Sequence, residues 1–94
     1  MTGKERAKLR SMANTIQPIF QIGKGGVGEA MLEQLGMALD ARELIKITVL
    51  ETADVTAREA CEILCEALGA EPVQCIGRKV TIYRRNEKEP KIQL

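Results

Sequence analysis

Hydrophobic positions recur at helical spacing in three stretches of the chain, and shorter apolar runs lie between them. Thr2 and Glu5 have the spacing of a capping box, so the first helix should begin there and end before Pro18. Thr56 and Glu59 repeat this signal ahead of the third helix. The three apolar stripes are Leu9, Met12, Ala13 and Ile16; Val27, Met31, Leu35, Ala38 and Leu39; and Ala57, Ala60, Cys61, Leu64 and Leu68. Each stripe predicts an amphipathic helix with one buried face.

Four short apolar runs rich in β-branched residues predict strands at 18–22, 43–50, 73–76 and 80–83. The last two are separated by Gly77, Arg78 and Lys79, a connection short enough for a hairpin. The resulting order is α-β-α-β-α-β-β. This order predicts an α/β sandwich (α+β), in which helices pack on one mixed four-stranded sheet.

A chain of 94 residues has room for one such domain, which we expect to span residues 1–85. Residues 86–94 are polar and are predicted to form a loose tail. The charged N-terminal segment lacks the apolar stretch of a signal peptide, and no apolar run reaches the ~20 residues of a membrane span. We therefore expect a cytoplasmic protein. We also expect it to be a monomer.

The side chains needed for metal binding or catalysis are scarce. The chain has no histidine, and its three cysteines form no Cys-x-x-Cys pair, so neither a zinc site nor a disulfide framework is predicted. Cys61 and Cys65 are expected to be reduced core residues. Glu43 could form an ion pair with Arg42 or Lys46 at a strand end. We expect no cofactor, no metal and no enzymatic activity.

Charge is unevenly distributed although the net charge is only +1. Residues 1–26 carry five basic residues against one acidic residue, net +4. Residues 27–76 carry ten acidic against three basic residues, net −7, and residues 77–94 carry six basic against two acidic, net +4. Basic ends flanking an acidic middle either serve solubility alone or form a binding surface for an anionic partner.

A glycine-rich turn at Gly23, Lys24, Gly25 and Gly26 lies between the first predicted strand and the second predicted helix. With Gly28 it matches the letters of a dinucleotide fingerprint, but the chain is too short for two βαβ halves, and Glu43 begins the next strand instead of ending it. No Gly-Lys-Ser/Thr follows, which excludes a P-loop.

The same turn can instead be a Gly-x-x-Gly backbone clamp, the device by which KH domains hold nucleotides, or simply a tight turn. Glycines admit a phosphate close to the main chain, and the helix that follows directs free amides toward it. Under this hypothesis Lys24 and the amides of Gly25, Gly26 and Val27 bind a phosphate. Further contacts would come from the basic ends, namely Lys4, Lys8, Arg10, Arg78 and Lys79, if the fold brings them near the turn.

Only Phe20 and Tyr83 are aromatic, which is too few for a base-stacking platform. The predicted mode of binding is therefore contact with RNA phosphates and recognition of RNA shape.

Two longer stretches carry a family resemblance: Gln17 to Val27, which includes Gly-Lys-Gly-Gly, and Ala38 to Ile47. Together with Thr2-Gly3-Lys4, Leu9-Arg10-Ser11, Ile76-Gly77 and Val80 to Tyr83, they resemble the CRM-domain family, and within it the stand-alone bacterial YhbY-like RNA-binding proteins. Gly28 departs from the pattern, because many relatives have a polar helix-capping residue there.

This resemblance implies a fold like the C-terminal domain of translation initiation factor three, and an RNA-binding surface made by the Gly-x-x-Gly loop and the first helix. It also implies association with precursor large ribosomal subunits during their assembly; plant relatives assist intron splicing.

The alternative to RNA binding is a protein-interaction module that uses the acidic middle segment. Its candidate residues, predicted to be exposed on helix faces, are Glu33, Asp40, Glu59, Glu62 and Glu66. A solvated helix face explains the same residues.

Overall fold

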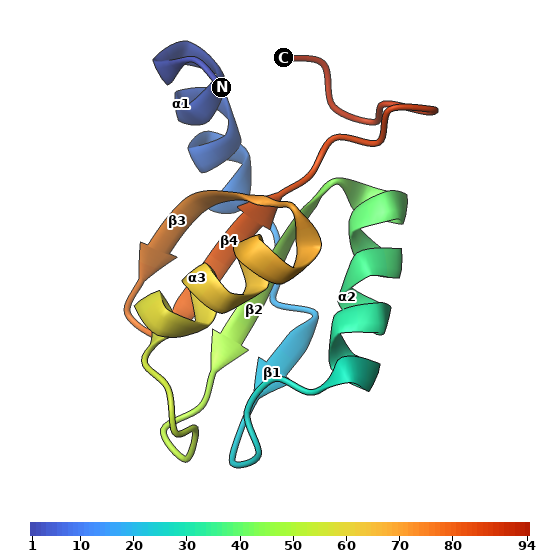
Figure 1. Cartoon of the computed structure of the whole chain (residues 1–94). Coiled ribbons are helices and arrows are strands. Elements are labelled where there is room, and N and C mark those ends of the chain that lie inside the picture. The colour runs from blue at the N-terminus through green and yellow to red at the C-terminus, as the bar shows by residue number, and fades with distance from the viewer.

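The computed structural model describes residues 1–94 and contains the seven predicted elements in the predicted order (Figure 1). The helices are α1 (Gly3–Ala13), α2 (Glu29–Arg42) and α3 (Ala57–Leu68). The strands are β1 (Phe20–Ile22), β2 (Leu44–Val49), β3 (Glu71–Ile76) and β4 (Lys79–Tyr83). No helix has both the length and the apolar character needed to cross a membrane.

The four strands form one mixed sheet in the order β1-β2-β4-β3. Strand β1 runs parallel to β2, with Ile22 opposite Val49, and the other two pairings are antiparallel. The predicted hairpin joins β3 to β4, and Gly77 takes the positive φ of 60° that favours glycine in a tight turn. The predicted mixed four-stranded sheet is confirmed.

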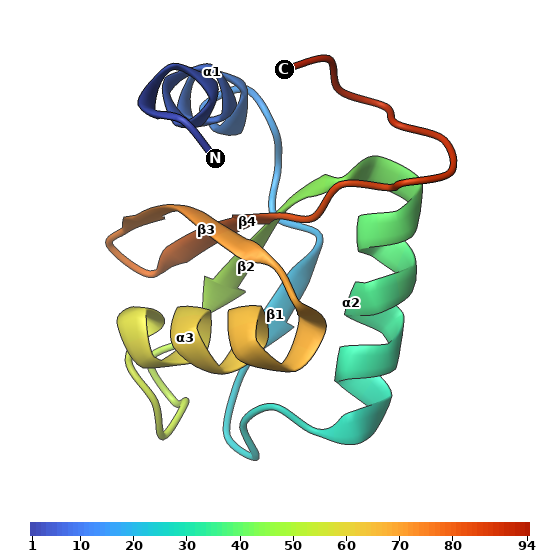
Figure 2. The ribbon, with the colours of Figure 1, turned by 45° about the horizontal axis from the view of Figure 1, so that its top comes forward.

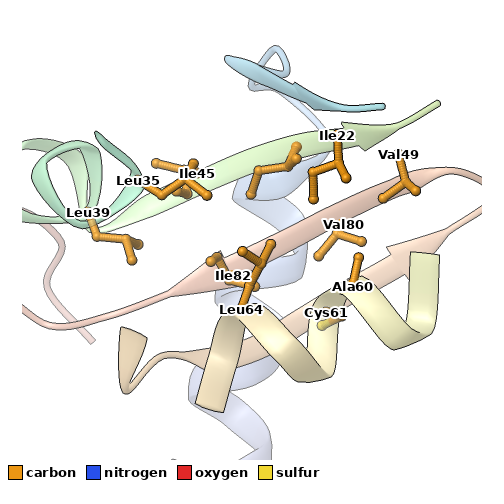
Figure 3. Close-up of a cluster of buried hydrophobic side chains, with 11 residues drawn as sticks. Ile22, Leu35, Leu39, Ile45, Val49, Ala60, Cys61, Leu64, Val80 and Ile82 are labelled. Atoms are coloured by element: carbon orange, nitrogen blue, oxygen red, sulfur yellow. The ribbon is translucent and has the colours of Figure 1, made fainter. Parts of the chain in front are cut away.

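One face of the sheet is covered by α2 and α3, and the main core lies between these layers (Figure 3). Alternate residues of β2 and β4 enter this core because successive strand side chains point to opposite faces. The buried members are Ile22, Leu35, Leu39, Ile45, Ile47, Val49, Ala60, Cys61, Leu64, Val80 and Ile82. The apolar stripes predicted for the second and third helices are the faces that pack here, and Cys61 and Cys65 are reduced residues in or against this core.

The other face of the sheet is covered only in part, by α1 (Figure 2). Leu9 packs on Leu44, Val73 and Tyr83, which lie where β2 begins and β4 ends. Met12, Ile16 and Ile92 of the C-terminal segment extend this smaller cluster. The remainder of this face carries no helix.

Both predicted capping boxes are present, at Thr2 and at Thr56, and Gly69 ends α3 in the left-handed conformation. The sequence predicted only that α1 ends before Pro18, and in the structure the helix already ends at Ala13. Thr15 accounts for the difference, because its amide and its hydroxyl both donate to the Met12 carbonyl and close the last turn.

The prediction of a loose C-terminal tail is wrong for residues 86–92. The buried carboxylate of Glu43 accepts hydrogen bonds from the backbone amides of Asn86, Lys91 and Ile92 at 2.6, 2.7 and 2.6 Å. The predicted ion pair of Glu43 with Arg42 or Lys46 does not form. Three backbone donors satisfy this buried carboxylate instead, which composition could not reveal.

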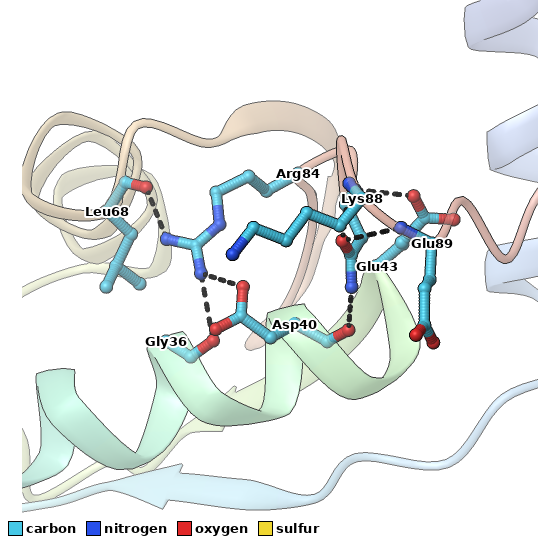
Figure 4. A network of polar contacts seen from close by, with 8 residues as sticks. Gly36, Asp40, Glu43, Leu68, Arg84, Lys88 and Glu89 are labelled. Atoms are coloured by element: carbon cyan, nitrogen blue, oxygen red, sulfur yellow. Dashed lines mark hydrogen bonds and ion pairs between the residues drawn. The ribbon is translucent and has the colours of Figure 1, made fainter.

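A second polar contact ties the ends of α2 and α3 together (Figure 4). The Arg84 guanidinium donates to the Leu68 carbonyl at 2.8 Å, and to the Gly36 carbonyl and the Asp40 carboxylate at 2.9 Å each. The Asn86 side chain caps the neighbouring Asp40 carbonyl at 2.8 Å. The segment after β4 therefore fixes the arrangement of the two helices on the sheet.

Candidate RNA interface

The glycine turn leaves the end of β1 as a tight, hydrogen-bonded loop at the edge of the sheet (Figure 1). The Gly26 amide donates to the Gly23 carbonyl at 3.0 Å, which places Lys24 and Gly25 at the tip. Gly25 has φ of 118° and Gly26 has φ of 67°, both in the region that side chains disfavour. Two of the glycines are therefore required by backbone conformation alone.

The loop also presents free backbone donors. The amides of Lys24, Gly25, Val27 and Gly28 make no hydrogen bond, and the first intrahelical bond of α2 is that of Leu32 with the Gly28 carbonyl. The first three amides of α2 are consequently unpaired as well. The Gly26 amide, which the sequence also predicts to bind a phosphate, already donates within the turn. Gly25 and Val27 retain theirs, although the Val27 side chain packs on the core.

Lys24 is exposed at the tip of this loop and has no acidic partner. The helix that follows adds the positive end of its dipole. An unpaired ammonium beside several free amides is an arrangement that favours an anion such as a phosphate.

The loop is held in place by the strands next to it. The Leu50 amide donates to the Ile22 carbonyl at 2.8 Å and extends the parallel pairing of β1 with β2 to the edge. A Cβ atom on Gly23 would lie 3.5 Å from Leu50 Cδ1 and 3.8 Å from Thr52 Oγ1. The loop thus packs beside the β2–α3 connection.

The β3–β4 hairpin lies at the same end of the sheet as the glycine loop, the condition for Arg78 and Lys79 to contribute to the site. The Val49 amide donates to the Arg78 carbonyl at 2.7 Å, and Lys79 lies opposite Thr48 on β2. Arg78 forms an exposed ion pair with Glu51 at 3.1 Å, while Lys79 is exposed and unpaired. Lys79 is therefore the freer cation of the two.

The basic residues of α1 are not brought to this edge. Lys4, Lys8 and Arg10 are exposed, but α1 packs where β2 begins, whereas the glycine loop lies where β2 ends. The length of β2 separates them, roughly 17–20 Å at about 3.3 Å per residue. The Lys8 ammonium also donates to the Gln93 carbonyl of the C-terminal segment. The expectation that the solvent face of α1 lies near the loop is wrong.

Lys46 is a further cation, which the sequence did not predict as part of a binding surface. The ion pair that the sequence allowed for it does not form: Lys46 lies half-exposed in the middle of β2, on the face without α2 and α3, and has no acidic partner. The alternation of Leu44, Lys46 and Thr48 with Ile45, Ile47 and Val49 is the signal that places it there.

No group of three or more metal-ligating side chains is present. The acidic residues of the alternative hypothesis are all exposed, as predicted. Two of them have structural roles, because Asp40 pairs with Arg84 and Glu59 completes the capping box of α3. Hydrogen bonds within that box hold the pKa of the Glu59 carboxyl below its usual value. Glu33, Glu62 and Glu66 remain unpaired on the helix surfaces.

The fold and the loop at the end of β1 place the protein in a known class. The chain belongs to the CRS1/YhbY (CRM) domain family, whose model matches residues 1–84, and the resemblance seen in the sequence is confirmed.

Two relatives match this chain over its full length. It is 39% identical over 94 residues to the "probable RNA-binding protein YqeI" of Bacillus subtilis, covering all of this chain and 98% of that protein. It is 31% identical over 94 residues to an "RNA-binding protein" of Haemophilus influenzae, covering 94% of it.

Among solved structures, the solution structure of the hypothetical protein SAV1595 from Staphylococcus aureus superimposes with a TM-score of 0.81 at 45% identity. The match covers all of this chain and 98% of that one, so the fold is shared from end to end.

Proposed function

We propose that this protein is a non-catalytic, cytoplasmic RNA-binding protein that acts as a monomer and holds an RNA phosphate at the glycine loop. The observation that carries the proposal is the unpaired Lys24 ammonium beside the free amides of Gly25, Val27 and the start of α2. The names of the family relatives support the same function. Lys79 widens the contact at this end of the sheet as a free cation, and Arg78 does so by exchanging its exposed Glu51 partner for a phosphate.

The partner we propose is ribosomal RNA within precursor large ribosomal subunits, as the family resemblance implies. A domain with no exposed aromatic platform suits such a partner, because structured RNA is recognised mainly through phosphates and shape. Lys4, Lys8 and Arg10 would then contact a separate segment of RNA, since α1 lies at the other end of β2.

The test is a titration of fluorescent structured RNA from the large ribosomal subunit with wild-type protein and Lys24→Glu, at several salt concentrations. Because each phosphate contact releases counterions, wild-type affinity should fall steeply with salt. Reversing the charge at Lys24 should weaken binding by roughly tenfold or more, on the order of 1.4 kcal/mol. Lys88→Glu is the matched control, since Lys88 is exposed, unpaired and remote in the C-terminal segment.

Equal losses for Lys24→Glu and Lys88→Glu would show that only net charge matters and would remove the loop from the proposal. Absence of RNA binding by wild-type protein would overturn the proposal altogether. The acidic helix surfaces would then be the next candidate, tested by capture of a protein partner that survives nuclease treatment.

A further inference from the structure

The face of the sheet opposite α2 and α3 is polar where α1 does not cover it, apart from the exposed side chain of Ile76. Helix α1 packs over one end of this face, at Leu44, Val73 and Tyr83, as Figure 2 shows. The end nearer the glycine loop carries two cross-strand rows of side chains. They are Gln21, Thr48, Lys79 and Ile76 in one row, and Lys46, Thr81 and Gln74 in the other, where Thr81 is itself buried. Neither row contains a carboxylate.

The two lysines of this face are uncompensated. Lys46 lies opposite Thr81, and Lys79 is two residues away along β4, so the two are diagonal neighbours about 7–8 Å apart at their backbones. Both are at least partly exposed, and neither forms an ion pair. A solvated sheet face needs no particular charge, whereas two adjacent free ammonium groups attract a polyanion.

A groove of about 640 Å³ lies on this face and reaches Gln21, two residues before the glycine loop. It is lined by the α1–β1 connection and the start of β1 (Gln17, Pro18, Ile19, Phe20 and Gln21), by Thr48 of β2 and by Lys79 of β4. Gln21 precedes the last residue of β1, after which the loop begins. An RNA strand with one phosphate bound at Lys24 can therefore continue past Gln21 into this groove and onto the open face.

We propose that the open face binds a single RNA strand that runs from the glycine loop across β2 and β4, with Lys79 and Lys46 holding phosphates. This inference rests on the proposed function of the loop and adds its substrate class, unpaired RNA. The amides of Gln21 and Gln74 contact base edges, which an unpaired strand exposes and an A-form duplex hides in its narrow major groove. No aromatic side chain belongs to either row, and Phe20, which lines the groove, packs against the main core, so recognition is by hydrogen bonds and charge.

The experiment titrates labelled oligouridylate of about 12 nucleotides, within the range of single-domain site sizes, and a duplex RNA of the same length. The proteins are wild type, Lys46→Gln/Lys79→Gln, Lys24→Gln and the control Lys88→Gln. Loss of two phosphate contacts should reduce the slope of log affinity against log salt by about 1.4, since each contact of a single strand contributes about 0.7. We expect the double variant to bind ~10-fold more weakly, and the control to be unchanged.

Wild-type protein supplies an independent readout. On addition of the oligonucleotide, NMR shift changes should fall on Gln21, Thr48 and Gln74 and leave α3 unmoved. Shifts confined to the glycine loop, or a double variant with wild-type affinity and slope, would overturn the open-face proposal. If Lys24→Gln still weakened binding in that case, the proposed function of the loop would stand.

Two further outcomes test the choice of a single strand and the RNA-binding function itself. Tighter binding of the duplex, lost in the double variant, would overturn the choice of a single strand. If neither the oligonucleotide nor structured RNA bound wild-type protein, the loop and the open face would both be excluded.

Discussion

The Glu43 carboxylate and the backbone amide of Ile92 are 49 positions apart in the chain and form a hydrogen bond of 2.6 Å. Glu43 lies between α2 and β2 with a positive φ of 67°, and its side chain is fully buried. Hydrogen bonds from Asn86 and Lys91 complete its shell. One carboxylate therefore joins the α2–β2 junction to the C-terminal segment.

We predict that Glu43→Gln destabilises the protein by on the order of 2 kcal/mol, the scale of hydrogen bonds to a charged group. A glutamine amide can keep one oxygen for Lys91 and Ile92 but sets an N–H₂ donor against the Asn86 amide. Urea denaturation measures the loss. Glu33→Gln, at an exposed and unpaired glutamate, is the control and should change stability little. Equal stability of the two variants would contradict a structural role for the buried carboxylate.

The stability difference between wild type and Glu43→Gln should depend on pH. Burial alone would raise the pKa of the Glu43 carboxyl, but the hydrogen bonds from Asn86, Ile92 and Lys91 outweigh burial and lower this pKa from its ordinary 4.5. The carboxylate therefore stabilises the fold fully above about pH 4.5, and this stabilisation is lost as pH falls toward the lower pKa of the folded state.

Denaturation of both proteins from neutral pH to about pH 3 tests this dependence. The difference should be constant near neutrality and narrow below about pH 4.5. The pKa values of Glu5 and Glu59 are also lowered, by their capping boxes, but both proteins share these residues. A difference that widened in acid would show that the pKa of Glu43 is raised.

Arg84→Lys should destabilise the packing of α2 against α3. The guanidinium reaches the Leu68 carbonyl from one nitrogen and Gly36 and Asp40 from another, and a lysine ammonium cannot span both helices. We expect a loss of about 1–3 kcal/mol in the free energy of unfolding. Arg85→Lys is the matched control, because Arg85 is exposed and its contact with Glu87 is 3.7 Å long. Similar losses for both variants would contradict the bridging role.

Substitutions of Gly28 should separate stability from RNA binding. Gly28 is the N-cap of α2, has an extended backbone and no side-chain cap, and a Cβ atom there meets nothing within 4 Å. Gly28→Asn and Gly28→Asp should both stabilise the fold by a few tenths of a kcal/mol. Only the aspartate places a negative charge beside the free amides, so RNA affinity should fall for Gly28→Asp alone. Thermal denaturation and RNA titration of the pair measure the two effects, and equal affinities would contradict a phosphate site at this helix start.

The order and nature of the elements could be predicted because their signals are local. The capping boxes at Thr2 and Thr56 act within three residues, and the stripe ending at Leu68 has the period of a helix. The end of an element shifts where a side chain competes with the pattern, as Thr15 does at the end of α1. The glycine turn was also found from sequence, since the backbone of Gly25 admits few other residues.

The sequence by itself therefore determined the elements, the sheet class and the turn that carries the candidate phosphate site. Only the tertiary structure decided that Lys79 lies at the same end of the sheet as this turn while Lys4, Lys8 and Arg10 do not, because the pairing of β1, β2 and β4 sets which ends meet. It also decided that the Gly26 amide donates a hydrogen bond within the turn, and that Lys46 lies on the open face of the sheet. Glu43 binds the C-terminal segment for the same reason. These depend on contacts between distant parts of the chain, which local periodicity and composition do not encode.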